Sequence, residues 1–329
     1  MDPITHGISG AALARAFPKK PLPRTQVLLL IAMAMAPDID YVLHWFSDEL
    51  YLEHHRGITH SILMLPLWTW LVVSLLPKRR EQNPILPWLI AAALGLHILL
   101  DVITSFGTMI LAPLSDWRAT LDLVFIIDPI FTGLMLLPLL LIPFSKRLAR
   151  PLAAASLALM FAYIGLCAWN HQRAMAFVEK TWPDAPVKAA LPLPFSPFNW
   201  QLIAAWPDHD MDAAVNLLPS FRGTMPWFPA SLTGPYARYL HPPGQLQWRK
   251  LAAMTEANAP DSIPGMAFYR WFARFPVVLH EGPHRREFGD LRFGAGMPDA
   301  PPAFSLRIDL TPKPRAWLIW HSRHATPLH

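Results

Sequence analysis

Cysteine is almost absent from the sequence, because Cys167 is the only one in 329 residues. A single thiol excludes an intrachain disulfide and a thiolate metal cluster. Cys167 lies inside an apolar run, so we interpret it as a residue of the packed interior. Any metal site in this chain must therefore be built from nitrogen and oxygen ligands.

Charged residues are also scarce, at 16% of the sequence, whereas soluble domains contain about 25%. Hydrophobic residues make up 53% and mean hydropathy is +0.27, which favours a membrane protein with room for one further domain. The net charge of +5 does not point to a nucleic-acid partner, because the basic residues lie in short loops between apolar runs. The N-terminus has no basic region and no evident cleavage site, so no cleavable signal peptide is expected.

The apolar runs predict an all-α polytopic membrane domain over 1–170, with a short N-terminal helix and about five spans. The N-terminal helix is expected over 4–17, with Thr5 or Asp2 as its cap. Pro37 interrupts the first span, which reaches spanning length only if the helix continues past the proline with a kink or break. The predicted spans are 25–46, 58–76, 85–111, 123–144 and 151–169.

A change in composition near His171 predicts a second, β-rich domain over 171–329. Prolines become frequent there, and strand-like runs replace the long apolar ones. The runs expected to form strands are 265–279, 304–310 and 316–322, and the last two flank a hairpin-like connection over 311–314.

Basic residues in alternate connections predict the orientation of the membrane domain. The positive-inside rule places these connections in the cytoplasm, so the β-rich domain should be extracytoplasmic and most of the candidate ligands should lie near the outer ends of the spans. The cytoplasmic residues are expected to be Lys19, Lys20, Arg24, Lys78, Arg79, Arg80, Lys146, Arg147 and Arg150.

The strongest signal for chemistry is the pair His97 and Asp101 inside an apolar helix. Residues four apart lie on the same face of a helix, so an imidazole and a carboxylate face the same point. An ionisable residue inside a membrane span is costly, about 2.5–3.5 kcal/mol on insertion scales, and by default marks a function. Taken alone, His97 could equally form an interhelical hydrogen bond.

Further histidines and aspartates are expected to join this pair in a metal site. Nitrogen and oxygen ligands without sulfur suit zinc, manganese or iron, and the ligand types do not choose among these metals. Six groups exceed the needs of one tetrahedral site, so one or two ions are expected, with Asp101 as the carboxylate that bridges two ions and a water between them as nucleophile. Asp38 and Asp40 could instead be helix caps, and His60 could be interfacial. The predicted ligands are His6, Asp38, Asp40, His60, His97 and Asp101.

Asp101, Asp40 and Arg56 are the predicted catalytic residues. Arg56 could hold an anionic substrate group, or form an exposed ion pair with Glu53. His55, Asp122 and Asp128 are secondary ligand candidates; Asp122 could instead cap the following helix, and Asp128 could instead orient a ligand histidine.

The segment His280–His284 matches the H-E-x-x-H pattern of zinc proteases. That chemistry requires a helix, and Gly282 and Pro283 lie between the histidines, so a turn is the better interpretation.

Four motifs in order resemble the YdjM-like family of bacterial inner-membrane, metal-dependent hydrolases over about 1–145. The same order of ligands is similar to that of zinc phospholipase C and the S1/P1 nucleases, whose zinc clusters cleave phosphoesters. This resemblance implies zinc as the expected metal. The later His and Glu ligands of those enzymes have no clear counterpart here. The motifs are Met1–Gly7, Ala36–Asp40, His55–Ser61 and Gly95–Asp101.

Together these observations and the resemblance predict a multi-pass protein of the bacterial inner membrane that hydrolyses a lipid or lipid-linked phosphoester with a metal-activated water. The alternative is an intramembrane metal or proton transporter, or another metal-handling protein. A third interpretation is a membrane anchor whose C-terminal domain works through partners, which leaves the buried carboxylates without a role.

Overall fold

The computed structural model describes residues 1–77, 83–218, 238–294, 302–310, 313–320 and 324–328. It divides into two compact units. The first, here called the helical unit, comprises Met1–Val42 and His54–Leu166. The second, the sheet unit, comprises Leu43–Glu53 and Cys167–His329.

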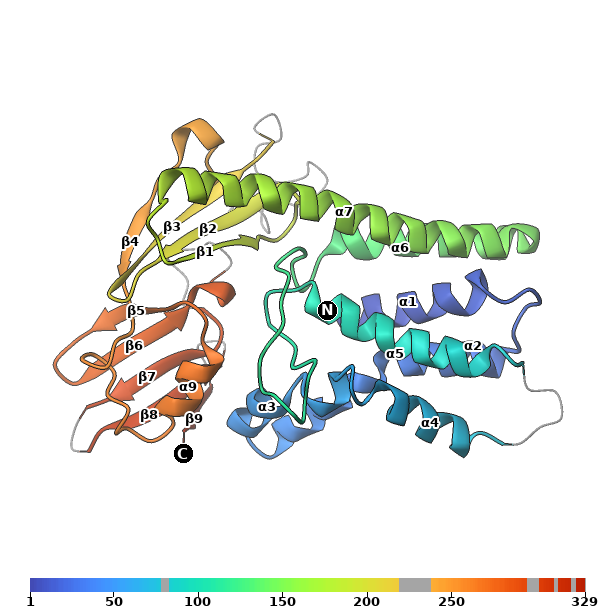
Figure 1. Cartoon of the computed structure of the whole chain (residues 1–329), viewed down its shortest axis with the longest axis horizontal. Helices are drawn as coiled ribbons and strands as arrows, with labels where there is room; N and C mark the ends of the chain where they lie inside the picture. Colours follow the sequence, from blue (N-terminus) through green and yellow to red (C-terminus); the bar gives the residue numbers. More distant parts are fainter. Residues whose placement is uncertain (78–82, 219–237, 295–301, 311–312, 321–323, 329) are drawn as a thin grey trace. The chain divides into compact units, whose positions relative to one another are not determined.

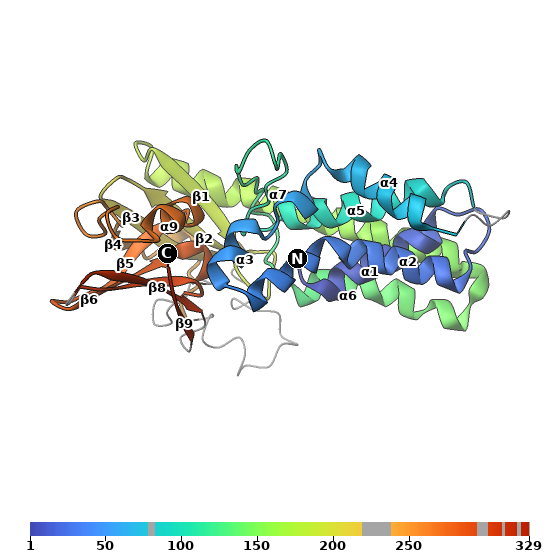
Figure 2. The same cartoon turned by 90° about the horizontal axis from the view of Figure 1, so that it is seen from below.

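The N-terminal part of the chain is helical, as its apolar runs predict. α1, α2 and α5 lie side by side in Figure 1 and Figure 2, and their facing residues, among them Leu13, Leu30 and Ile90, form one apolar core. Gly10 permits the close approach of α1 to α2, because a Cβ at this position would lie 2.6 Å from the Leu30 carbonyl oxygen. The helices are α1 (Pro3–Ala16), α2 (Arg24–Met35), η1 (Ala36–Trp45), α3 (Asp48–His54), η2 (Ile58–His60), α4 (Leu65–Leu75), α5 (Leu86–Val102), α6 (Pro129–Leu140), η3 (Ile142–Phe144), η4 (Lys146–Leu148) and α7 (Ala149–Thr181).

Two predictions about the first helices are confirmed. Asp2 caps α1, accepting a hydrogen bond of 3.0 Å from the Thr5 backbone N–H. The chain also stays helical past Pro37, but it changes from an α-helix to the 3₁₀-helix η1. Pro37 has no N–H to donate to Met33, whose carbonyl instead accepts from Ala36 three residues along.

Two predicted continuous spans are interrupted. The run 58–76 forms η2 and α4 with a non-helical break over 61–64, where Ile62 N–H donates to the Ile110 carbonyl and the Ser61 hydroxyl donates to the Ala112 carbonyl. The run 85–111 is helical only to Val102. These long-range hydrogen bonds replace those of a helix, so apolar character alone overestimated both helices.

Within the described residues, two apolar helical stretches are long enough to cross a membrane, Arg24–Trp45 and Lys146–Thr181. A third candidate span is present if the helices Asp48–His60 and Leu65–Leu75, which are bent relative to each other, form one span. The apolar segments Leu86–Val102 and Pro129–Phe144 are shorter. The structure thus supports a membrane protein, while five spans stay a prediction. The predicted basic loop Lys78–Arg80 lies outside the described residues.

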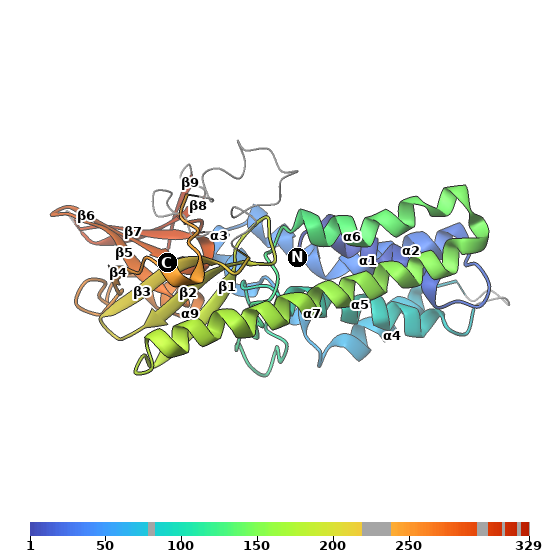
Figure 3. The same ribbon diagram turned by 90° about the horizontal axis from the view of Figure 1, so that it is seen from above.

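The sheet unit confirms the β-rich prediction and contains two antiparallel sheets. Trp200 and Leu202 of β2 pack against Ala174 and Val178 of α7, which runs along the first sheet in Figure 1 and Figure 3. The first sheet has the order β1 (Val187–Pro192), β2 (Asn199–Ala205), β3 (His209–Asn216), β4 (Arg249–Ala252). The second has the order β5 (Pro276–Glu281), β6 (Arg285–Asp290), β7 (Ser305–Asp309), β8 (Arg315–Trp320), β9 (His324–Pro327).

The predicted strands of this unit are partly correct. β7 and β8 pair as an antiparallel hairpin, with Ser305 opposite Ile319, although 311–312 and 321–322 lie outside the described residues. The run 265–279 was wrong as a single strand, since α9 (Met266–Phe272) precedes β5. Met266, Tyr269 and Phe272 are buried, and their spacing of three residues is that of a helix.

Candidate metal centre

The change of helix type at Pro37 sets the directions of Asp38 and Asp40. In an α-helix two residues advance by about 200°, which would place the carboxylates about 160° apart around the axis. In a 3₁₀-helix they advance by about 240° and lie about 120° apart. The 3₁₀-helix η1 thereby brings both carboxylates toward the same side, where they meet histidines from other segments.

Asp38, His60, His97 and Asp101 form one cluster of possible ligand atoms, here called the four-residue cluster. His60 Nε2 lies 3.0 Å from His97 Nε2, 3.5 Å from Asp38 Oδ1 and 3.1 Å from Asp101 Oδ2. His97 Nε2 lies 3.5 Å from Asp38 Oδ1 and 3.3 Å from Asp101 Oδ2. The structure thus brings together residues from η1, η2 and α5, and the predicted convergence of His97 with Asp101 is present.

The outer nitrogens of both histidines have partners that fix the rings. His97 Nδ1 lies 2.7 Å from the carbonyl oxygen of Ala34, which is in the last turn of α2. A carbonyl can only accept, so Nδ1 carries the proton and Nε2 presents a lone pair to the cluster. His60 Nδ1 lies 2.9 Å from Thr59 Oγ1, and this hydroxyl donates to Asp40 Oδ2 at 2.9 Å.

A second group consists of Asp38, Asp40 and His55. His55 Nδ1 lies 2.8 Å from Asp40 Oδ1, and the Arg56 backbone N–H donates to Asp40 Oδ2 at 3.1 Å. Asp38 belongs to both groups, whereas Asp101 belongs only to the four-residue cluster. The carboxylate placed between the two groups is therefore Asp38 and not Asp101, for which the bridging role was predicted.

His6 lies beside the four-residue cluster. Its ring stacks on that of His97 with 3.7 Å between centroids, and its Nε2 lies 3.4 Å from Asp101 Oδ1. The Met1 amino group also forms an ion pair with Asp101. His6, a predicted ligand, therefore contacts two residues of the four-residue cluster but belongs to neither ligand group.

Arg56 is buried and pairs with Asp101, so the alternative of an exposed ion pair is wrong. Its Nη2 lies 2.9 Å from Asp101 Oδ1, its Nη1 donates to Thr104 Oγ1 at 2.9 Å, and the residue is only 2% exposed. Its backbone has φ 61°, in the left-handed region. In this conformation the Arg56 backbone N–H reaches Asp40 and its guanidinium reaches Asp101. Arg56 therefore contacts one residue of the second group and one residue of the four-residue cluster.

The cluster fits a divalent ion. Ligand atoms of a tetrahedral zinc site with bonds of about 2.0–2.2 Å lie about 3.3–3.6 Å apart, close to the 3.0–3.5 Å found here. Asp101 Oδ2 is buried and has no hydrogen-bond partner among the described residues, although two imidazole nitrogens are within 3.3 Å. Asp101 Oδ2 and the Nε2 atoms of His60 and His97 therefore lie around a shared point, as ligands of one ion do.

Three other candidates lie outside these groups. Asp128 caps α6 through the Ile130 and Phe131 N–H groups and accepts a hydrogen bond of 2.6 Å from the Tyr163 hydroxyl, so it does not orient a ligand histidine. Asp122 does not cap α6, because Asp128 does; its carboxylate accepts from Thr120. In His280–His284, Gly282 N–H donates to the Arg285 carbonyl in the turn between β5 and β6, which confirms the turn.

The sequence interpretation missed the groups that hold the ligands in place. Thr59, Thr104 and the Ala34 carbonyl orient His60, Arg56 and His97 respectively. Thr59 stands next to His60 in the sequence and could have been found from that position. The Ala34 carbonyl could not, because every residue carries one.

Comparison with known proteins agrees with the predicted family. The sequence profile of the YdjM inner membrane protein family matches residues 1–174, and the chain therefore belongs to this family. The uncharacterized protein YfhP of Bacillus subtilis (strain 168) is 30% identical over 138 residues. This match covers 39% of the present chain and 42% of YfhP, so the chain spans less than half of that relative. No solved structure matches the chain. The similarity to zinc phospholipase C stays a prediction.

Proposed function

We propose that this protein is a membrane-bound metal-dependent hydrolase that acts on a lipid or lipid-linked phosphoester. The observation that carries the proposal is the four-residue cluster, whose nitrogen and oxygen atoms have the spacing of ligands around one ion. Asp38, His60, His97 and Asp101 would hold this ion, with zinc as the expected metal. Asp38, Asp40 and His55 would hold a second ion if two are bound.

The metal would supply Lewis acidity, which acidifies water and neutralises developing negative charge on a phosphoester. The protein contributes the fixed positions of the ligands. Arg56 keeps Asp101 ionised and oriented through its 2.9 Å ion pair, and the Ala34 carbonyl keeps the His97 lone pair directed inward. Because both partners are buried, neither ligand needs to reorganise when substrate binds.

Access to the cluster supports a lipid-like substrate. The Asp38 side chain is 23% exposed, whereas those of His60, His97 and Asp101 are fully buried, so substrate would approach from the side of Asp38. Ile39, between the two aspartates, is 72% exposed, and Ile58, near His60, is 45% exposed. Exposed apolar side chains next to a polar site suit a substrate that carries a hydrocarbon chain.

The test is metal analysis of the purified full-length protein, with phosphate release from a lipid phosphomonoester and a lipid phosphodiester. We expect one or two zinc ions per chain, turnover of at least one substrate, and loss of both in His97→Ala. His284→Ala is the matched control, because this histidine lies in the β5–β6 turn and should leave metal and activity unchanged. Equal metal in wild type and His97→Ala would contradict the site.

The transporter alternative is tested by reconstituting the full-length protein in proteoliposomes and following metal flux together with phosphate release. Flux that His97→Ala abolishes, with no turnover of either phosphoester, would replace the hydrolase by a transporter. The concentration of the candidate ligands in one cluster, rather than along a path, supports the hydrolase.

A further inference from the structure

A basic cleft lies at the end of α1 and α2 remote from the metal centre. It has a volume of about 830 Å³, and seven of its lining residues are Lys or Arg while none is Asp or Glu. Arg15 stands nine residues after His6 on α1, a distance of about 14 Å along a helix. The cleft is thus separate from the four-residue cluster.

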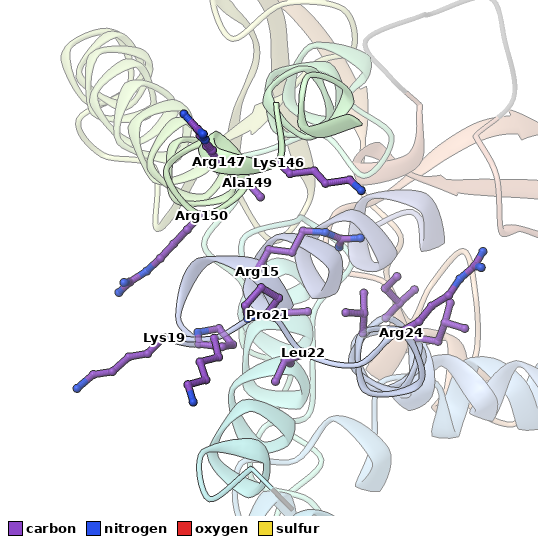
Figure 4. Close-up of a pocket in the computed structure, with 15 residues that line it drawn as sticks. Arg15, Lys19, Pro21, Leu22, Arg24, Lys146, Arg147, Ala149 and Arg150 are labelled. Atoms are coloured by element: carbon purple, nitrogen blue, oxygen red, sulfur yellow. The ribbon is translucent and has the colours of Figure 1, made fainter. Parts of the chain in front are cut away.

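Three separate segments contribute its cations. Arg15 comes from α1, Lys19 from the connection to α2, and Lys146 and Arg150 from the beginning of the α7 region. In Figure 4 the labelled side chains surround the opening, with Arg15 and Lys146 extending to one side and Lys19 and Arg150 to the other. No carboxylate forms an ion pair with any of these four cations in the part of the chain that the structure describes.

Stabilisation of the C-terminal end of α1 explains only two of these four cations, Arg15 and Arg150. Arg15 Nη1 donates to the Ala11 carbonyl at 2.9 Å, and Arg150 Nε donates to the Ala16 carbonyl at 3.1 Å, both near the negative end of the α1 dipole. Lys19 and Lys146 have no such acceptor among the described residues. Their charges remain available to an anion.

The cleft lies where a lipid headgroup would lie. The two unbroken candidate spans, Arg24–Trp45 and Lys146–Thr181, both begin with a residue that lines it. Cations at the ends of spans lie at the level of phospholipid headgroups, where basic pockets between helices hold anionic lipids.

An apolar groove continues from the cleft. Arg15 and Ile31 line both cavities, and the groove of about 400 Å³ extends between α1 and α6. Ile4, Ile8 and Ala11 line it at helical spacing on one face of α1, and Arg15 is its only charged lining residue. A phosphate on the cations would therefore have a hydrocarbon-compatible surface directly beside it.

We propose that the basic cleft binds the headgroup of an anionic phospholipid and that the groove along α1 and α6 receives one of its acyl chains. The proposal stands on this cleft and groove and does not depend on the metal centre. Its ligand chemistry is a phosphate diester with an attached hydrocarbon chain.

The test measures lipid bound to the full-length protein in mild detergent, by mass spectrometry after titration with dioleoyl phosphatidylglycerol or dioleoyl phosphatidylcholine. We expect preference for phosphatidylglycerol, and roughly tenfold or greater loss of its affinity in Lys19→Gln/Lys146→Gln, because each cation near the headgroup contributes to attraction. The matched control Lys180→Gln/Lys250→Gln removes two exposed cations elsewhere and should change affinity by less than about twofold.

A second variant separates lipid from free phosphate. Ala11→Phe places an aromatic ring in the groove and should weaken phosphatidylglycerol binding without changing the binding of inorganic phosphate. Equal phosphatidylglycerol affinity in wild type and Lys19→Gln/Lys146→Gln would overturn the proposal. The proposal would also be overturned if inorganic phosphate displaced the lipid completely and Ala11→Phe left phosphatidylglycerol binding unchanged. That result would indicate a site for a free anion. Unchanged elution in size exclusion and unchanged metal content show that each variant is folded. If Lys19→Gln/Lys146→Gln does not pass this folding control, Lys19→Gln alone is compared with the wild type for its affinity for phosphatidylglycerol.

Discussion

Both units of the molecule bury carboxylates, but they surround them differently. In the sheet unit, Asp290 accepts the backbone N–H groups of Arg274 at 2.8 Å and Arg292 at 3.0 Å, and the Arg292 guanidinium at 2.7 Å. In the helical unit, Asp101 Oδ2 faces two imidazole nitrogens without a hydrogen bond. Asp290 has donors on both of its oxygens, as expected of a carboxylate that stabilises a fold. Asp101 pairs with Arg56 and the Met1 amino group through Oδ1, and its Oδ2 faces the two imidazole nitrogens, which suits a cation.

The sheet unit also contains a third arrangement. Asp210 on β3 is buried near Asp290 and Asp212. Burial, followed by the charges of Asp290 and Asp212, raises the pKa of Asp210 to about 7. A buried carboxylate with two acidic neighbours is therefore kept neutral at acidic pH.

The largest expected effect separates stability from metal binding. Asp290→Ala should lower the free energy of unfolding of the sheet unit by about 3–5 kcal/mol, because it leaves the buried Arg292 charge without its partner. Chemical denaturation followed by tryptophan fluorescence measures this change. Asp290→Asn, which keeps an acceptor oxygen, should cost less. Metal content should stay at the wild-type level, and its loss would remove the distinction between the two units.

The next effect concerns metal content and the proposed activity rather than stability. Asp101→Asn keeps the shape of the side chain but removes its charge, so metal should be partly retained while phosphoesterase activity falls by about 100-fold, equivalent to about 2.7 kcal/mol. Metal stoichiometry and initial rates measure both. Asp128→Asn is the matched control, because Asp128 is a buried cap of α6 outside the ligand groups. Similar losses in both variants would show a general effect of buried charge.

The smallest effect concerns pH. A raised carboxyl pKa means that the folded state favours the protonated form of Asp210, so its stabilising contribution is full below pH about 4 and is lost as pH rises through about 7. Asp210→Asn should therefore stabilise the protein more at pH 8 than at pH 5, by about 1–2 kcal/mol. Denaturation of the full-length protein at both pH values measures it. A gain independent of pH would mean that Asp210 is ionised throughout this range.

The sequence was informative where one local rule determines the structure. A run of small and apolar residues together with Asp2 predicted α1 with its cap, and the Gly-Pro pair predicted the turn at His280–His284. Interruptions caused by distant partners were missed. At Ser61, for example, hydrogen bonds to the carbonyls of Ile110 and Ala112 interrupt the helix expected over 58–76. Such contacts depend on the tertiary structure and leave no local pattern.

For the candidate site, the sequence predicted which residue types gather but not their arrangement. Asp38, His60, His97 and Asp101 were expected together because their motifs lie at the ends of apolar runs. The placement of Asp38 between two groups follows from the 3₁₀ geometry of η1, which composition does not indicate. Arg56 was expected either to hold an anionic substrate group or to form an exposed ion pair with Glu53, and neither alternative indicated the buried ion pair with Asp101.

Gly10 sets the spacing between α1 and α2, and through α2 it affects the orientation of His97 on α5. A Cβ at position 10 would lie 2.6 Å from the Leu30 carbonyl oxygen and 2.8 Å from the Ala34 Cβ, so any larger residue would push α2 outward. The carbonyl of Ala34 is the one that holds His97 Nδ1 at 2.7 Å. A single methyl group on α1 would thus displace the carbonyl that orients the His97 ring, so position 10 is constrained by the candidate metal centre as well as by packing.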